Sequence, residues 1–124
     1  MNKTTTLLMS ILVFFSCNLN NEKSLEIAQV FENYYQESLK LYPLQATSQG
    51  DLRYNDFLPN DLSDEFRTRE KEFYTFYKSQ LNNFPDQTLN ENDLLSKKVL
   101  LWECDLSLKR LTFNEQYTPI NQMW

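Results

Sequence analysis

The sequence predicts an all-α fold built from about three amphipathic helices. One glycine and four prolines occur among 124 residues, too few turn-forming residues for an all-β chain. Aromatic residues make up 15% of the chain although its mean hydropathy is -0.58. This combination is typical of amphipathic helices with bulky inner faces rather than of disorder. A chain of this length has room for one small domain.

Residues 1–17 have the pattern of a lipoprotein signal peptide. Lys3 supplies a short positive region, Leu7–Phe15 are mostly apolar, and small Ser16 precedes Cys17 as in a loosened lipoprotein box. The apolar run is far below the roughly 20 residues that a membrane-spanning helix needs. We predict that Cys17 is lipidated and anchors the chain to a membrane of the cell envelope, in the periplasm or at the outer membrane. The alternative is cleavage nearby by ordinary signal peptidase, which leaves Cys17 as a free thiol.

Residues 18–23 are expected to form a short polar tether, and the first helix of the mature chain is predicted over about 22–41. Apolar side chains recur there at steps of three and four residues. We expect the tyrosine rings of this stripe to be core side chains with partnered hydroxyls rather than a ligand site. The stripe comprises Leu25, Ala28, Phe31, Tyr35, Leu39 and Tyr42, widened by Ile27, Val30, Tyr34 and Leu41.

A connector over residues 42–63 separates the first two helical patterns. Pro43 ends the first helix, residues 44–49 can form one further helical turn, and Gly50 can close that turn because glycine adopts positive φ at no steric cost.

Four polar residues of this connector suggest a calcium-binding loop: Asp51, Arg53, Asn55 and Asp56. Their spacing, however, does not match that of such a loop. Counting Asp51 as the first ligand places Asp56 where a glycine is needed and Leu62 where a bidentate glutamate should be. We expect turn capping by aspartate instead, and an ion pair between Arg53 and one of the acids.

The second helix is predicted from Asp64 to about Asn82, with Ser63 as its N-cap. Its apolar stripe is expected to face the core, and its charged run to face solvent with ion pairs along the helix. The stripe consists of Phe66, Phe73, Phe76, Tyr77, Leu81 and Phe84, and the charged run of Arg67, Arg69, Glu70, Lys71 and Glu72.

The third helix is predicted over about 91–111. Either Thr88 with Glu91 or Asn90 with Asp93 has the spacing of a capping box. Apolar residues cover more than half of its circumference, so we expect it to lie inside a larger fold, because in a stand-alone fragment part of that surface would be exposed. Cys104 is expected to be a small buried apolar residue without a redox or metal role.

Several sequence blocks resemble the N-terminal region of the bacterial family called domain of unknown function 885. The main block is AT-x-x-GD-x-RYND-x-LP-x-DLS at residues 46–63; YY-x-E-x-L-x-L-x-P at 34–43 precedes it, and LLWECDLSLKRLTF at 100–113 and TPINQMW at 118–124 follow it. The resemblance runs from about Leu25 to the end. Members of this family are several times longer and all-helical, with an HExxH zinc motif far downstream, similar to zinc carboxypeptidases of the gluzincin type.

The resemblance implies that residues 24–124 are the N-terminal helical part of a truncated larger domain in a lipoprotein member. The chain contains no histidine, so no catalytic or zinc-binding residue of the family can be carried over onto it. We therefore expect no cofactor in this chain, zinc only in a full-length relative, and no catalysis by the chain alone.

Two hypotheses about function follow. In the first, these helices form part of the wall around a peptide-binding cleft of the full-length protein, with seven polar residues nearest the cleft; the alternative for each is that it only fixes the loop. In the second, the chain is a small lipid-anchored helical binding module without catalysis. The net charge of -5 argues against nucleic acid as a partner. The expected cleft-lining residues are Asp51, Arg53, Tyr54, Asn55, Asp56, Asn121 and Gln122.

Overall fold

The computed structural model describes residues 3–114, with side chains from residue 22 onward, and confirms the all-α prediction. Three long helices and two short ones account for the regular structure of these residues, which include no strand. In chain order they are α1 (Lys3–Leu41), α2 (Pro43–Ser48), α3 (Asp64–Asn82), the 3-10 helix η1 (Asp86–Thr88) and α4 (Glu91–Arg110).

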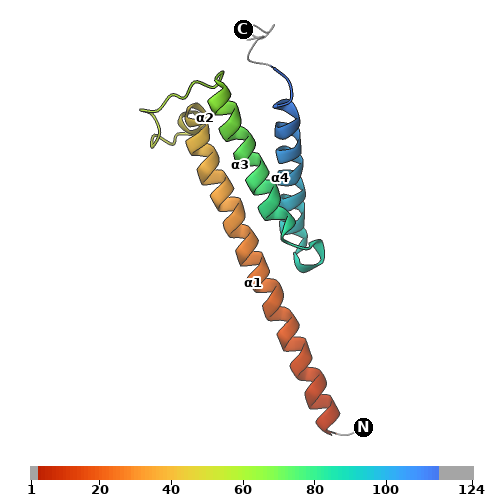
Figure 1. Ribbon diagram of the computed structural model, residues 1–124. Coiled ribbons are helices and arrows are strands. Elements are labelled where there is room, and N and C mark those ends of the chain that lie inside the picture. Colours follow the sequence, from red (N-terminus) through yellow and green to blue (C-terminus); the bar gives the residue numbers. More distant parts are fainter. Residues whose placement is uncertain (1–2, 115–124) are drawn as a thin grey trace.

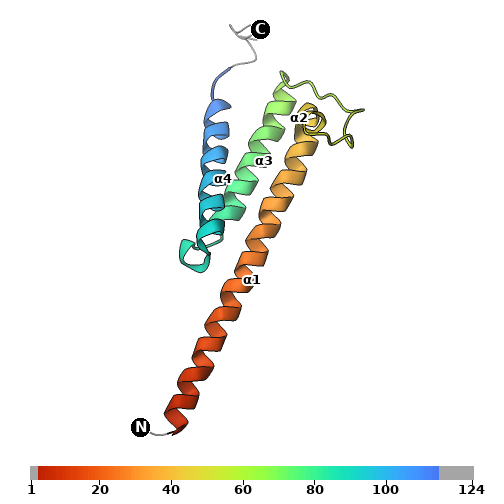
Figure 2. The same ribbon diagram turned by 180° about the vertical axis from the view of Figure 1, so that it is seen from behind.

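The long helices run up, down and up (Figure 1). Helix α3 packs against both α1 and α4, and α1 also contacts α4. The connector and the end of α4 lie at one end of this bundle, and the turn that contains η1 lies at the other (Figure 2). The N-terminal half of α1 extends beyond the bundle (Figure 1). Segments far apart in the sequence therefore meet at the connector end.

Helix α1 begins much earlier than the sequence predicts. It starts at Lys3 rather than near residue 22, so residues 18–23, expected to be a tether, lie within it. No proline or glycine occurs between its ends, so nothing in the backbone interrupts the helix. Pro43 then ends it as expected, and a new short helix begins at that proline.

The ends of α3 and α4 follow the predicted caps. The Ser63 hydroxyl accepts a hydrogen bond from the Phe66 amide at 3.2 Å, and α3 has the predicted bounds. Of the two candidate caps for α4, the structure has Asn90, whose side-chain oxygen accepts from the Asp93 amide at 2.9 Å. These bonds satisfy helix N–H groups that have no partner within the helix.

The core lies where the three long helices meet. The Tyr34 ring packs edge-on against Tyr77 at 5.2 Å between centroids and beside Phe73 at 5.1 Å. Cys104 is fully buried as predicted, and burial raises the pKa of its thiol to about 11. The buried apolar residues are Ile27, Leu39, Ala46, Phe66, Tyr74, Tyr77, Leu81, Phe84 and Cys104.

Parts of the predicted stripes are wrong. Phe76 is 52% exposed and Tyr35 is 46% exposed, whereas Glu70, expected on the solvated face, is only 5% exposed. The buried face of α3 runs through Phe66, Glu70, Tyr74, Tyr77 and Leu81, at steps of four, four, three and four. Because Glu70 is charged and lies in the middle of this run, the sequence pattern did not identify this face of α3 as the buried one.

Gly50 adopts the positive φ expected of it, at 85°. Its amide donates to the Thr47 carbonyl at 3.0 Å, and the next amide donates to the Ala46 carbonyl at 2.9 Å, which closes α2. A Cβ added here would contact nothing within 4 Å, so any cost of substitution comes from the backbone.

We expect Gly50→Val to lower the free energy of unfolding by about 1 kcal/mol or more, because a β-branched residue is strained at positive φ. Gly50→Asn should lose less, because asparagine tolerates this region. Thermal unfolding followed by circular dichroism measures both. A valine variant as stable as the parent would contradict the prediction.

Candidate functional site

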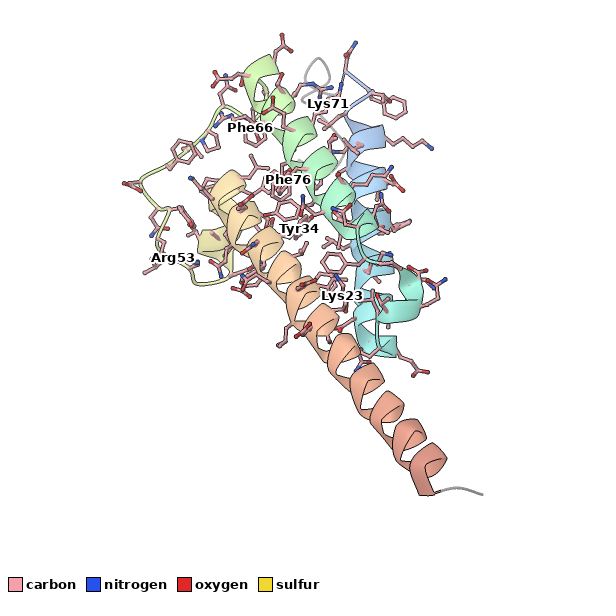
Figure 3. The ribbon with its side chains drawn as sticks, turned by 60° about the horizontal axis from the view of Figure 1, so that its bottom comes forward. Lys23, Tyr34, Arg53, Phe66, Lys71 and Phe76 are labelled. Carbon is pink, nitrogen blue, oxygen red and sulfur yellow. The ribbon has the colours of Figure 1, made fainter. Side chains whose placement is uncertain are left out.

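A cavity of about 280 Å³ lies at the connector end of the bundle. The ends of α1 and α4 and the start of α3 form it together with the last part of the connector, and Figure 3 shows Phe66 at the start of α3 beside that connector. Its wall carries two carboxylates and two guanidinium groups over an aromatic and aliphatic surface. The lining residues are Tyr42, Asp61, Leu62, Phe66, Arg67, Glu70, Arg110 and Leu111.

Glu70 is the buried acid of this wall, with a side chain only 6% exposed. Its Oε1 atom accepts from the Tyr42 hydroxyl at 2.7 Å and from Arg110 Nη2 at 3.2 Å. The Tyr42 and Tyr74 hydroxyls lie 2.9 Å apart. Burial, and then the hydrogen bonds to Tyr74 and Glu70, raise the pKa of Tyr42, so this hydroxyl stays protonated and donates. The junction between α1 and α2 is thus joined to α3 and α4 through one carboxylate.

Arg67 holds the second guanidinium at the cavity wall. Its Nη2 donates to the carbonyls of Leu111 and Phe113, each at 2.8 Å. Carbonyls at the end of a helix lack partners within the helix, and a cationic donor also suits the negative end of the helix dipole. Arg67 therefore joins the first turn of α3 to the end of α4 at the wall of the cavity.

The predicted pair of Arg53 and an acid is confirmed. Arg53 Nη2 lies 2.6 Å from Asp51 Oδ2, and the Arg53 amide donates to Asp51 Oδ1 at 3.0 Å. These hydrogen bonds lower the pKa of Asp51. Arg53 Nη2 also donates to Gln36 on α1 at 2.8 Å. Figure 3 shows Arg53 on the connector, where these contacts hold the loop against α1.

The neighbouring polar residues also fix the loop. The Arg53 guanidinium lies 5.5 Å from the centre of the Tyr54 ring, and Asn55 accepts from the Thr47 hydroxyl at 2.7 Å. Asp56 is exposed.

None of the five described residues expected near a cleft lines the 280 Å³ cavity. Asn121 and Gln122 lie outside the described residues, and a cleft-lining role for any of the seven stays a prediction.

Sequence reasoning missed the residues that do form the cavity. Glu70 was assigned to the solvated face, Asp61 was noted only within the block at residues 46–63, and Arg110 carried no signal of its own. The available signal was the spacing of Glu70, which lies four residues from Phe66 and four from Tyr74, two aromatic residues on one helix face.

In the described part of the chain, no three histidine, cysteine, aspartate or glutamate side chains lie close enough to hold a metal ion. No helix in the same part is long and apolar enough to cross a membrane. The side chain of Cys17 lies outside the described ones.

Comparison with known proteins leaves the family open, because no family model, no curated protein and no solved structure matches this chain. The resemblance carried by residues 46–63 and their flanks therefore stays a prediction.

Tyr77 contrasts with the partnered tyrosines of the cavity. It is 1% exposed, and its hydroxyl has no partner in hydrogen-bonding geometry among the described residues. Burial raises its pKa, and the nearby Glu37 carboxylate raises it further. An unpaired buried hydroxyl costs free energy.

We expect Tyr77→Phe to raise the free energy of unfolding by about 1 kcal/mol, because it removes this unpaired group and keeps the ring. Tyr42→Phe should lower it by about 1 kcal/mol, since it removes a donor to the buried Glu70 carboxylate. Urea titration of both variants measures the difference. Changes in the free energy of unfolding that are equal in size and sign for the two variants would contradict this prediction.

Proposed function

We propose that this protein is a lipid-anchored protein of the cell envelope whose helices form the N-terminal part of a larger helical hydrolase resembling zinc carboxypeptidases. The cavity lined by Asp61, Arg67, Glu70 and Arg110 is the observation that supports it most, because cleft walls combine an apolar surface with a few polar groups in fixed positions. In this proposal the connector end forms part of the wall of a cleft for a peptide. Zinc belongs to the downstream part of a full-length protein, and the present chain alone does not catalyse.

The coding region beyond Trp124 tests the larger-protein part of this proposal. An open frame that continues and encodes HExxH is the expected result. A stop codon with no remnant of such a motif would overturn it.

The cavity's role is tested in the full-length enzyme. There, Asp61→Asn is expected to raise the KM for a peptide substrate, while Asp64→Asn, at the exposed start of α3 but outside the cavity, should leave KM unchanged. Asp61 is exposed, so its substitution should disturb folding little. Equal KM values in both variants would show that the cavity is not part of the substrate cleft.

Lipid anchorage is tested by metabolic labelling with palmitate in bacterial cells. The parent chain should carry the label and sediment with membranes, and Cys17→Ser should do neither. Cys104→Ser is the matched control, because it removes the other cysteine from a buried position. An unlabelled parent chain would contradict anchorage through Cys17.

A second candidate is a lipid-anchored helical module that binds a partner without catalysis. It is favoured by four apolar side chains of α4 that are between 48% and 63% exposed: Leu95, Val99, Trp102 and Leu106. Thermal unfolding of residues 18–124 by circular dichroism separates the candidates. A cooperative transition supports the module, and aggregation or non-cooperative unfolding supports a chain that needs a larger body.

A further inference from the structure

Helix α4 presents a row of exposed apolar side chains with the spacing of a coiled-coil seam. Leu95, Val99, Trp102 and Leu106 follow one another at steps of four, three and four residues, which is the alternation of the a and d positions of a heptad. Part of the apolar surface of this helix is thus exposed in this chain, as expected if the helix lies inside a larger fold only in a longer protein. We use the name α4 row for these four side chains.

The surface beside the α4 row is hollowed. A groove of about 570 Å³ lies between this row and α1, and is lined by Tyr34, Leu95, Ser96, Val99, Leu100 and Glu103. The side chains of a second helix laid along the row would enter this groove as knobs enter holes.

The charges beside the α4 row define how that second helix would lie. Lys98 and Asp105 are exposed, seven residues apart, and on one flank of the row. Asp105 is 58% exposed even though it pairs with Lys78 of α3 at 2.5 Å. The opposite flank carries Glu103 and Arg110, and Arg110 is engaged with Glu70 inside the bundle.

An antiparallel second copy complements both the shape and the charge of this surface. With the two-fold axis between Val99 and Trp102, Val99 faces Trp102 of the second copy and Leu95 faces its Leu106, so a large side chain meets a small one at the centre. Lys98 then lies beside Asp105 of the second copy, and the symmetry makes this pair twice.

A parallel arrangement suits the surface less well. It would set Trp102 against Trp102 and require Arg110 to leave Glu70 for Asp105 of the second copy.

We propose that this protein forms an antiparallel homodimer through the α4 row, with Lys98 and Asp105 of the two copies paired across the seam. The inference rests on the second candidate function, the binding module, and names its partner as a second copy of this chain. It is independent of lipidation, so loss of the label in the Cys17 experiment would leave it intact.

The test uses two differently tagged full-length copies produced in the same cells, extracted in non-ionic detergent and captured through one tag. The variants are Lys98→Glu, Asp105→Lys and the two combined. Lys78→Ser is the first control, because it breaks the intrachain pair of Asp105 and leaves the seam unchanged. Leu52→Ser is the second, since Leu52 is 68% exposed but outside α4. Circular dichroism verifies the helix content of every variant.

We expect the parent copies to co-purify, each single reversal to weaken dimerisation roughly tenfold because two pairs become repulsive, and the double variant to regain most of it. Both controls should co-purify like the parent. Parent copies that do not co-purify would overturn the proposal. That result would favour the first candidate function, in which the rest of a larger protein covers the α4 row. Single reversals without effect would also overturn it, and a double variant that stays dissociated would exclude the antiparallel register.

Discussion

Replacing Glu70 with alanine is expected to lower the free energy of unfolding by about 3 kcal/mol, because it removes the acceptor shared by a tyrosine and an arginine at a buried position. The hydroxyl of Tyr42 and the guanidinium of Arg110 both donate to Glu70 Oε1. Without the carboxylate, the Tyr42 hydroxyl loses this acceptor at a part-buried position. Arg110 is half-exposed, so water compensates its loss, and most of the cost arises at the tyrosine and in the space left behind.

Urea titration followed by circular dichroism measures this effect, with two matched variants. Glu70→Gln keeps the size and one acceptor oxygen, so it should lose about 1 kcal/mol. Glu72→Ala removes an exposed glutamate from the same helix and should change the stability by no more than about 0.5 kcal/mol. Similar losses from Glu70→Ala and Glu72→Ala would show that the carboxylate network contributes nothing.

Local signals predicted the helices of this protein well. Ser63 and Asn90 cap α3 and α4, and Gly50 closes α2, because each of these features depends on a few neighbouring residues and on backbone geometry. The start of α1 differs from the prediction, which was made for the chain without its signal peptide. The structure includes those residues, and the helix between Lys3 and Leu41 contains no proline or glycine that would interrupt it.

The cavity could not be predicted in the same way because its residues come from four separate segments. Tyr42, Asp61, Glu70 and Arg110 meet only when α1, α3 and α4 pack at the connector end. The prediction that Glu70 faces solvent was wrong as well, because a glutamate within a charged run is normally solvated. The hydroxyl of Tyr42, 28 positions away in the sequence, donates to the Glu70 carboxylate, and a buried polar group needs such a partner.

The packing partners of α4 could not be predicted from the sequence either. Its apolar residues cover more than one face, and the bundle uses only the part that includes Cys104. The sequence shows that such a helix needs partners on two sides. It does not show which partner is supplied by the chain itself and which comes from outside.

Truncation of Leu81 to alanine is expected to have the largest effect of any single change considered, a loss of about 2–5 kcal/mol. Leu81 is fully buried near the end of α3. A small domain has little surplus stability, so we expect this variant to lose its cooperative transition at a temperature where the parent is folded.

Leu52→Ala is the matched control for this truncation, since it removes the same atoms from a side chain that is 68% exposed. Its expected change is within about 0.5 kcal/mol. Thermal and urea unfolding of both variants decide whether residues 22–114 have a core of their own. If the two truncations cost the same, the helices are held together by something other than the packing around Leu81. If only Leu81→Ala unfolds the chain, the three helices form a cooperative unit, which is the property that a binding module needs and that a piece dependent on a larger body lacks.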